Sequence, residues 1–202
     1  ILISVAIRSC AFLFLWLQKE FRGLNLLEGT TEAGTNDIWK ILKIGAPLGL
    51  TEISALASIA VIGVFVAQFG VYALAAHNIA HNVFVLAHVL IFGLSRATVI
   101  QVGLRVGQGA SRSAMKSLIS TAFFVALLIG CSAAILILAL AADIAALYSQ
   151  DTSVVTTLTS LLVFVAILRL LDDCTMILQA SLEGLQRTKA IFQIRTTSHW
   201  FV

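Results

Sequence analysis

SLISTAFFVALLIGCSAAILILALAA, residues 117–142, contains no charged side chain. A helix needs about 20 apolar residues to cross a hydrocarbon core of about 30 Å, because each residue rises about 1.5 Å. Three other runs reach that length, at residues 44–69, 71–102 and 152–184. Backbone groups in lipid must find partners inside their own segment, and runs this long do so only as helices. The sequence therefore predicts an all-α polytopic membrane protein with four complete transmembrane helices and a partial one at each end.

The composition points to lipid as the main solvent. Hydrophobic residues make up 59% of the chain, charged residues make up 11%, and the mean hydropathy is +1.01. An ordinary soluble domain carries roughly 25% charged residues. The lipid bilayer is thus the first expected partner. The net charge of +3 does not indicate nucleic-acid binding, because the basic residues are divided among short loops between the apolar runs.

The basic residues occur in alternate loops, and this pattern predicts how the chain is oriented across the membrane. The loops around Gly70 and between Asp143 and Asp151 contain no Lys or Arg. By the positive-inside rule, the basic loops should face the cytoplasm of a multi-pass protein in the cell (inner) membrane. The basic residues of the other loops are Lys19, Arg22, Lys40, Lys43, Arg105, Arg112, Lys116, Arg187 and Lys189.

The predicted segments fall into three parts. Residues 1–22 are the end of a preceding transmembrane helix, and residues 23–43 are a cytoplasmic linker with a short amphipathic helix. Residues 44–202 form one helical lobe, with the start of a further helix at 190–202. Both ends of the chain fall within apolar runs, so we expect it to be part of a longer protein.

Three ionisable residues share one helix face in the middle of a span. An ionisable group there costs at least about 2.5–3.5 kcal/mol, so it needs a partner or a purpose. Arg169 precedes Asp172 by three residues and Asp173 by four, the spacings at which helical side chains meet. Two carboxylates against one guanidinium leave an excess negative charge that H⁺ or Na⁺ could neutralise. The alternative is a structural ion pair whose second acid reaches water.

A fourth acid lies near the start of the first complete span. Glu52 is five residues past Pro47, which removes a backbone donor and can kink the helix beside the acid. Glu52 is therefore a second candidate for ion coupling. The alternative is that it faces a water-filled vestibule at the cytoplasmic end.

Three histidines form a stripe on one face of the second span. His77, His81 and His88 are spaced by four and seven residues, and such a stripe can relay protons. The alternative is that each imidazole is bonded to a neighbouring helix. His77 and His81 have the outline of H-E-x-x-H, but Asn78 occupies the position of the catalytic Glu. We therefore predict no metal site, no catalytic residue and no cofactor.

Four stretches of the sequence, at residues 44–50, 75–82, 102–109 and 182–188, are similar to motifs that occur together in one family of membrane proteins. IGAPLGL is similar to the family's G-x-P-I-G-L, and AAH with a later Asn resembles A-A-H-Q-x-x-x-N. VG with two later glycines resembles a loop that reads R-V-G-Q-A-L-G-A-G, and LEGLQRT resembles L-R-G-x-x-D-T-R. In their order along the chain, these stretches resemble the second six-helix lobe of the multidrug and toxic compound extrusion (MATE) family of transporters.

The resemblance implies a two-lobe, twelve-helix antiporter that expels amphipathic, often cationic drug-like compounds against H⁺ or Na⁺ by alternating access. It implies the N-terminal lobe of the same protein as a partner. Asp172 falls on the family's acidic position in the fourth helix of this lobe. Glu52 lies one turn before the family's other acid, at whose position this chain has Ala55.

Three other functions are weighed against antiport. A flippase for lipid-linked oligosaccharides would need more cations than Arg96 and Arg169 in its cavity. A non-transporting membrane subunit would leave Asp172 and Glu52 without a purpose. An intramembrane enzyme would need a catalytic set, and none is visible at a credible spacing.

Overall fold

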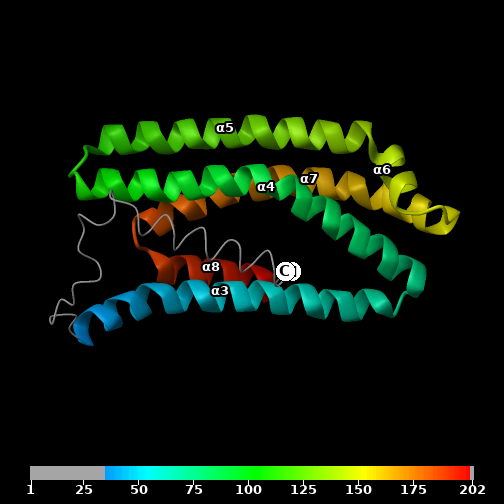
Figure 1. The fold of residues 1–202 in the computed structure, drawn as a ribbon, viewed down its shortest axis with the longest axis horizontal. Coiled ribbons are helices and arrows are strands. Elements are labelled where there is room, and N and C mark those ends of the chain that lie inside the picture. Colours follow the sequence, from blue (N-terminus) through cyan, green and yellow to red (C-terminus); the bar gives the residue numbers. More distant parts are fainter. Residues whose placement is uncertain (1–34, 201–202) are drawn as a thin grey trace, which may run out of the picture. The chain divides into compact units, whose positions relative to one another are not determined.

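The computed structural model describes residues 35–200, where the chain forms helices and, within that range, no strand. The fold class predicted from the sequence is confirmed, since four of the helices are long and apolar enough to cross a membrane. The predicted helix end at residues 1–22 lies outside the described residues. The helices are α3 (Thr35–Ala67), α4 (Val71–Gly107), α5 (Arg112–Ala139), α6 (Ala141–Tyr148), α7 (Thr152–Gly184) and α8 (Thr188–Trp200) (Figure 1).

The chain divides into two units, residues 1–41 and residues 42–202. In the first unit, the described part is the opening of α3, where the Lys40 ammonium lies 2.8 Å from the Asp37 carboxylate. Helix α3 is continuous from Thr35 onward. The amphipathic segment predicted before residue 44 therefore forms the first turns of α3 rather than a helix of its own.

The connections between helices depend on local backbone chemistry. Gly70 has a φ of +101° and Gly109 a φ of +67°, conformations that glycine adopts without a steric penalty. The Ser111 hydroxyl caps the start of α5, and the Asp151 carboxylate accepts a 2.8 Å hydrogen bond from a backbone N–H at the start of α7. These turns are short, so α3 runs antiparallel to α4 and α4 runs antiparallel to α5 (Figure 1).

Helix α7 is the element that four other helices of the second unit share. It packs against α4, α5, α6 and α8. Small side chains recur in the core between these helices, which lets their backbones approach closely in the absence of a strong hydrophobic force between helices. Core residues of this kind, together with two leucines of α7, are Ala76, Ala80, Ala166, Leu158 and Leu162.

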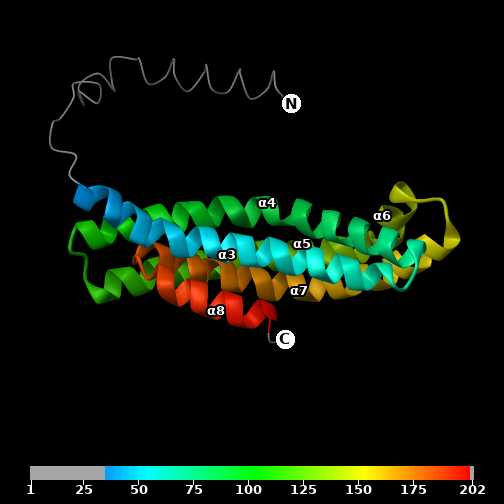
Figure 2. The same cartoon turned by 90° about the horizontal axis from the view of Figure 1, so that it is seen from below.

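The antiparallel order brings the basic loops to one end of the second unit. The α4–α5 and α7–α8 connections lie at that end, whereas the α3–α4 turn and α6 lie at the other (Figures 1 and 2). The basic end carries Arg112, Lys116 and Arg187, and the opposite end carries Asp143 and Asp151. The cytoplasmic orientation of the basic end stays a prediction.

Helices α4 and α7 approach each other closely at a glycine. A Cβ atom added at Gly184 would lie 2.7 Å from the Val102 Cβ and 2.8 Å from the Val99 carbonyl oxygen. Backbone atoms cannot rotate away from such a contact. Gly103, in the glycine-containing stretch at residues 102–109, lies within α4 and faces the Gly184 carbonyl oxygen.

Gly184→Ala should separate α4 from α7 and destabilise the protein by about 1–3 kcal/mol, the usual cost of overpacking. The thermal unfolding midpoint of the detergent-purified protein, measured by size-exclusion chromatography after heating, would fall. Gly103→Ala is the matched control, because its Cβ would lie 3.9 Å from the nearest atom, an ordinary contact. Equal midpoints for the two variants would contradict the close approach.

Candidate functional site

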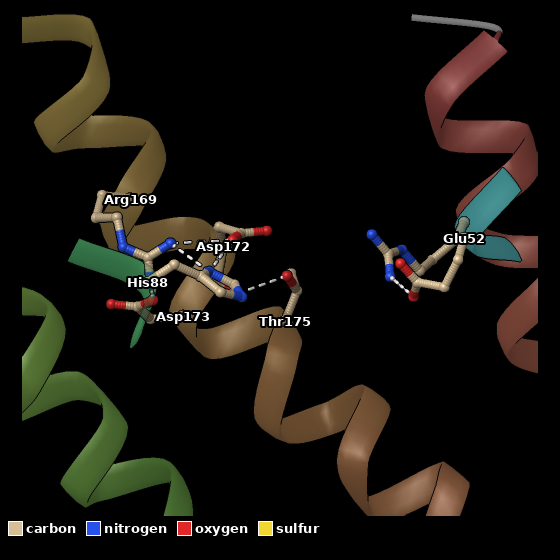
Figure 3. Close-up of polar contacts among 7 residues, drawn as sticks. Glu52, His88, Arg169, Asp172, Asp173 and Thr175 are labelled. Atoms are coloured by element: carbon tan, nitrogen blue, oxygen red, sulfur yellow. Dashed lines mark hydrogen bonds and ion pairs between the residues drawn. The ribbon is translucent and has the colours of Figure 1, made fainter. Parts of the chain in front are cut away.

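A cluster of ionisable side chains joins α4 to α7 near the middle of both helices. The Arg169 guanidinium is fully buried and forms an ion pair with Asp173. Its Nη1 atom lies 3.2 Å from Asp172 Oδ2 and 2.9 Å from His88 Nδ1 (Figure 3). The cluster of His88, Arg169, Asp172 and Asp173 is called the charge cluster below.

The two aspartates of the charge cluster occupy different environments. Asp173 is 1% exposed and points toward α5, where Gly130 leaves space for it. A Cβ at Gly130 would lie 2.9 Å from Asp173 Oδ2. The side chain of Asp172 is 39% exposed. Asp173 is thus the permanent partner of Arg169, whereas Asp172 can exchange with the surroundings.

Aromatic rings enclose the cluster on the α4 side. The Arg169 Cζ atom lies 5.0 Å from the centroid of the Phe84 ring, within the range of a cation–π interaction. The His88 ring lies between Phe84, at 6.3 Å, and Phe92, at 6.4 Å between centroids. Phe84 thus stabilises the Arg169 cation through its ring face, and Phe84 and Phe92 flank the imidazole of His88.

The hydrogen bonds assign a protonation state to His88. A guanidinium has no acceptor, so His88 Nδ1 accepts the bond from Arg169 and carries no proton in this structure. The same Nδ1 atom lies 3.6 Å from Asp172 Oδ2. With His88 neutral, one guanidinium faces two carboxylates, and the cluster keeps one excess negative charge. A proton on His88 or Asp172 removes that charge.

The same residues could be considered as a metal site. One ligand atom from each of His88, Asp172 and Asp173 lies within 4.8 Å of the others. Arg169 contacts all three of them. A fixed positive charge among the ligand atoms repels a divalent cation, so this arrangement fits a proton better than a metal ion.

A cleft lies beside the charge cluster, between α7 and α8. Its volume is about 490 Å³, which is within the range of small-molecule sites. Asp172 lines it together with apolar residues and a second guanidinium, that of Arg195. The cleft is lined also by Met176, Gln179, Ile191, Ile194 and His199. Asp172 therefore belongs to both the charge cluster and the cleft.

The other residues predicted for the site lie elsewhere. Glu52 is 66% exposed and pairs with Arg195 at 3.4 Å, away from the charge cluster (Figure 3). Among the described residues, neither His77 nor His81 forms a side-chain hydrogen bond or ion pair. Of the predicted histidine stripe, only His88 contacts the acids within residues 35–200. Ala55, at the family's acidic position, is buried.

Two contributors to the site did not emerge from the sequence. Arg195 lies within α8, whose mixed polar and apolar sequence does not mark a single charged residue for a role in the site. Gly130 lies in a run with no charge, and nothing in its neighbourhood on the chain indicates that it borders Asp173. That contact is visible only when α5 is packed on α7.

These features define a polytopic α-helical membrane protein with a charge cluster inside a span and an adjacent ligand-sized cleft. The MatE family model matches residues 47–199, and the chain belongs to the MatE family. The chain is 32% identical over 163 residues to the multidrug resistance protein MdtK of Edwardsiella ictaluri (strain 93-146). The match covers 81% of this chain and 35% of that relative, so the chain spans about a third of its length.

The two aspartates should differ in their effect on stability. Asp173→Asn leaves a buried guanidinium with a weaker partner, and breaking a buried pair typically costs about 3–5 kcal/mol. Asp172→Asn should cost less than about 1 kcal/mol, since Asp172 is partly exposed. Thermal unfolding of the two purified variants would measure this difference. A larger loss for Asp172→Asn would overturn the assignment of Asp173 as the structural partner.

Proposed function

We propose that this chain is part of a cation-coupled multidrug efflux antiporter in the cell (inner) membrane, and that Asp172 is the residue through which ion and substrate compete. The proposal rests on the observation that Asp172 belongs to both the charge cluster and the cleft. It contacts Arg169 and His88 on one side and lines the cleft between α7 and α8 on the other. Membership in the MatE family and the name of the multidrug resistance relative support the same function.

The contacts favour a proton as the coupling ion. His88 Nδ1 accepts from Arg169 when it is unprotonated, and it cannot accept that bond while carrying a proton. A proton on Nδ1 would therefore turn His88 from Arg169 toward Asp172, whose Oδ2 atom lies 3.6 Å away. An imidazole can act as a proton shuttle. Protonation thereby neutralises the excess charge of the cluster.

The substrate step follows from the same charge balance. When the cluster is deprotonated, the exposed Asp172 offers a negative charge to the cleft, and a cationic amphipathic compound can bind there with its apolar part against Met176 and Ile194. When a proton neutralises the cluster, the attraction is lost and the compound leaves. Two states with opposite affinities for ion and drug are what antiport requires.

The transporter requires a second helical bundle beside this one. Alternating access needs a second helical bundle that moves against this one, and we propose that the N-terminal lobe of the same protein supplies it. The described helices expose broad apolar faces to lipid or to such a bundle. On α3 these include Ile53, Leu56 and Phe65.

The flippase alternative receives less support from the contacts. Its anionic substrate would need cations that are free to bind phosphate. Arg96 lies 3.1 Å from Glu183 and Arg195 lies 3.4 Å from Glu52, while Arg169 contacts two aspartates. Each of these three guanidinium groups thus already faces a carboxylate.

Asp172→Asn should abolish ion-driven efflux while the protein still inserts in the membrane. The amide cannot alternate between a charged and a neutral form, so the drug and the ion no longer compete at this position. Efflux of a cationic dye by everted membrane vesicles would measure the loss. Asp143→Asn, the same substitution in α6 at the other end of the unit, is the control and should keep normal efflux. Normal efflux by Asp172→Asn would eliminate the proposed role.

Separate gradients test the coupling ion. A pH gradient alone should drive efflux in vesicles, a Na⁺ gradient alone should not, and His88→Gln should lose the response to the pH gradient. Glutamine can still accept from Arg169 but cannot carry a proton. His81→Gln tests whether His88 acts alone or as part of a histidine relay. We expect this variant to respond normally to the pH gradient. Efflux driven by Na⁺ alone, or an unchanged pH response in His88→Gln, would refute proton coupling through His88.

A further inference from the structure

A second groove lies along the first turns of α5 and shares one lining residue, Leu178, with the α7–α8 cleft. It has a volume of about 540 Å³ and is formed by the first turns of α5 with one contribution from α7. Its residues follow the helical spacings of i+3 and i+4, so they form one stripe along α5. The stripe begins with Arg112 and Lys116 and continues with Met115, Ile119 and Phe123, beside Leu178 of α7.

The two cations of the groove have no protein counter-ion within residues 35–200. Both side chains are exposed, and neither forms an ion pair with a described residue. A neighbouring cation behaves differently, because Arg105 donates a 2.6 Å hydrogen bond to the Ala114 carbonyl oxygen and thereby fixes the α4–α5 connection. The lining of the groove contains no acidic residue. Arg112 and Lys116 therefore offer an uncompensated positive charge to a ligand.

The groove has the polarity of a phospholipid. Its charged end lies at the basic end of the bundle, where the α4–α5 and α7–α8 connections meet, and its apolar part runs along α5 into the span. A phosphate at the membrane surface followed by an acyl chain at greater depth matches that order. Cytoplasmic leaflets are rich in anionic lipids, and basic pockets between transmembrane helices bind their headgroups.

We propose that this groove binds one anionic phospholipid, with its phosphate between Arg112 and Lys116 and an acyl chain along Ile119, Phe123 and Leu178. Charge complementarity selects the occupant. A zwitterionic lipid brings an ammonium group that the two cations repel, whereas a lipid with net negative charge does not. The bound lipid fixes the start of α5 against α7, on which the charge cluster is built.

The test is lipid binding to the full-length transporter by native mass spectrometry. The purified protein is titrated with phosphatidylglycerol and, separately, with phosphatidylcholine of the same acyl chains. We expect tighter binding of phosphatidylglycerol, and a double variant, Arg112→Gln with Lys116→Gln, should bind it roughly thirtyfold more weakly, given the typical contribution of each basic residue near an anionic surface. Equal affinities of the unchanged protein for the two lipids would overturn the proposal.

The matched control is the double variant Arg187→Gln with Lys189→Gln, which removes two exposed cations from the same end of the bundle but outside the groove. It should keep the preference for phosphatidylglycerol. An equal loss in the control would indicate a diffuse surface charge and refute a defined site.

Two further measurements on the unchanged protein separate a lipid from a free anion. Dihexanoyl phosphatidylglycerol should bind more weakly than the long-chain lipid, because its short chains cannot cover the apolar part of the groove. Inorganic phosphate at millimolar concentration should not displace the long-chain lipid. Displacement by phosphate, or an affinity independent of chain length, would overturn the proposal. Both measurements use the unchanged protein, so they do not depend on whether the double variant folds.

Discussion

Arg169 carries a permanent positive charge in the middle of a membrane-spanning helix, where it is shielded from water. A buried guanidinium needs acceptors for its N–H groups, because an unpaired charge inside the membrane is costly. Asp173 and Asp172 on the same helix and His88 on α4 supply them. Because one of those partners comes from another helix, the requirement to satisfy Arg169 also fixes how α4 and α7 face each other.

The packing around this contact is built for close approach. Gly184 brings α7 against the backbone of α4 at the basic end, and Gly130 opens a space in α5 that Asp173 fills. Alanines occupy much of the core between these contacts. A rigid α4–α7 pair keeps Asp173 in place while Asp172 remains partly exposed beside the cleft. The structure thereby separates a permanent ion pair from an adjustable carboxylate.

In the proposed antiporter, this separation lets one residue serve two ligands. Asp172 is near enough to His88 to respond to its proton and near enough to the cleft to attract a cation. In the cluster, the ion pair of Arg169 and Asp173 then stays fixed, while His88 and Asp172 change their charge or partners. The proposed lipid groove is formed by α5 and α7. The proposed lipid and the proposed substrate would thus both contact α7, where Leu178 lines the groove and the cleft.

From the sequence alone, the apolar runs determined the helical class and the four spans, because lipid allows no other way to satisfy an uncharged backbone. Helical spacing likewise brought Arg169 together with its two aspartates, since residues three and four apart share a face. The tertiary structure alone decided which aspartate is buried, that His88 rather than His77 or His81 meets them, and that Glu52 pairs with Arg195 away from the cluster. These outcomes depend on contacts between helices, and the periodicity of one helix contains no record of the side chains that a neighbouring helix presents to it.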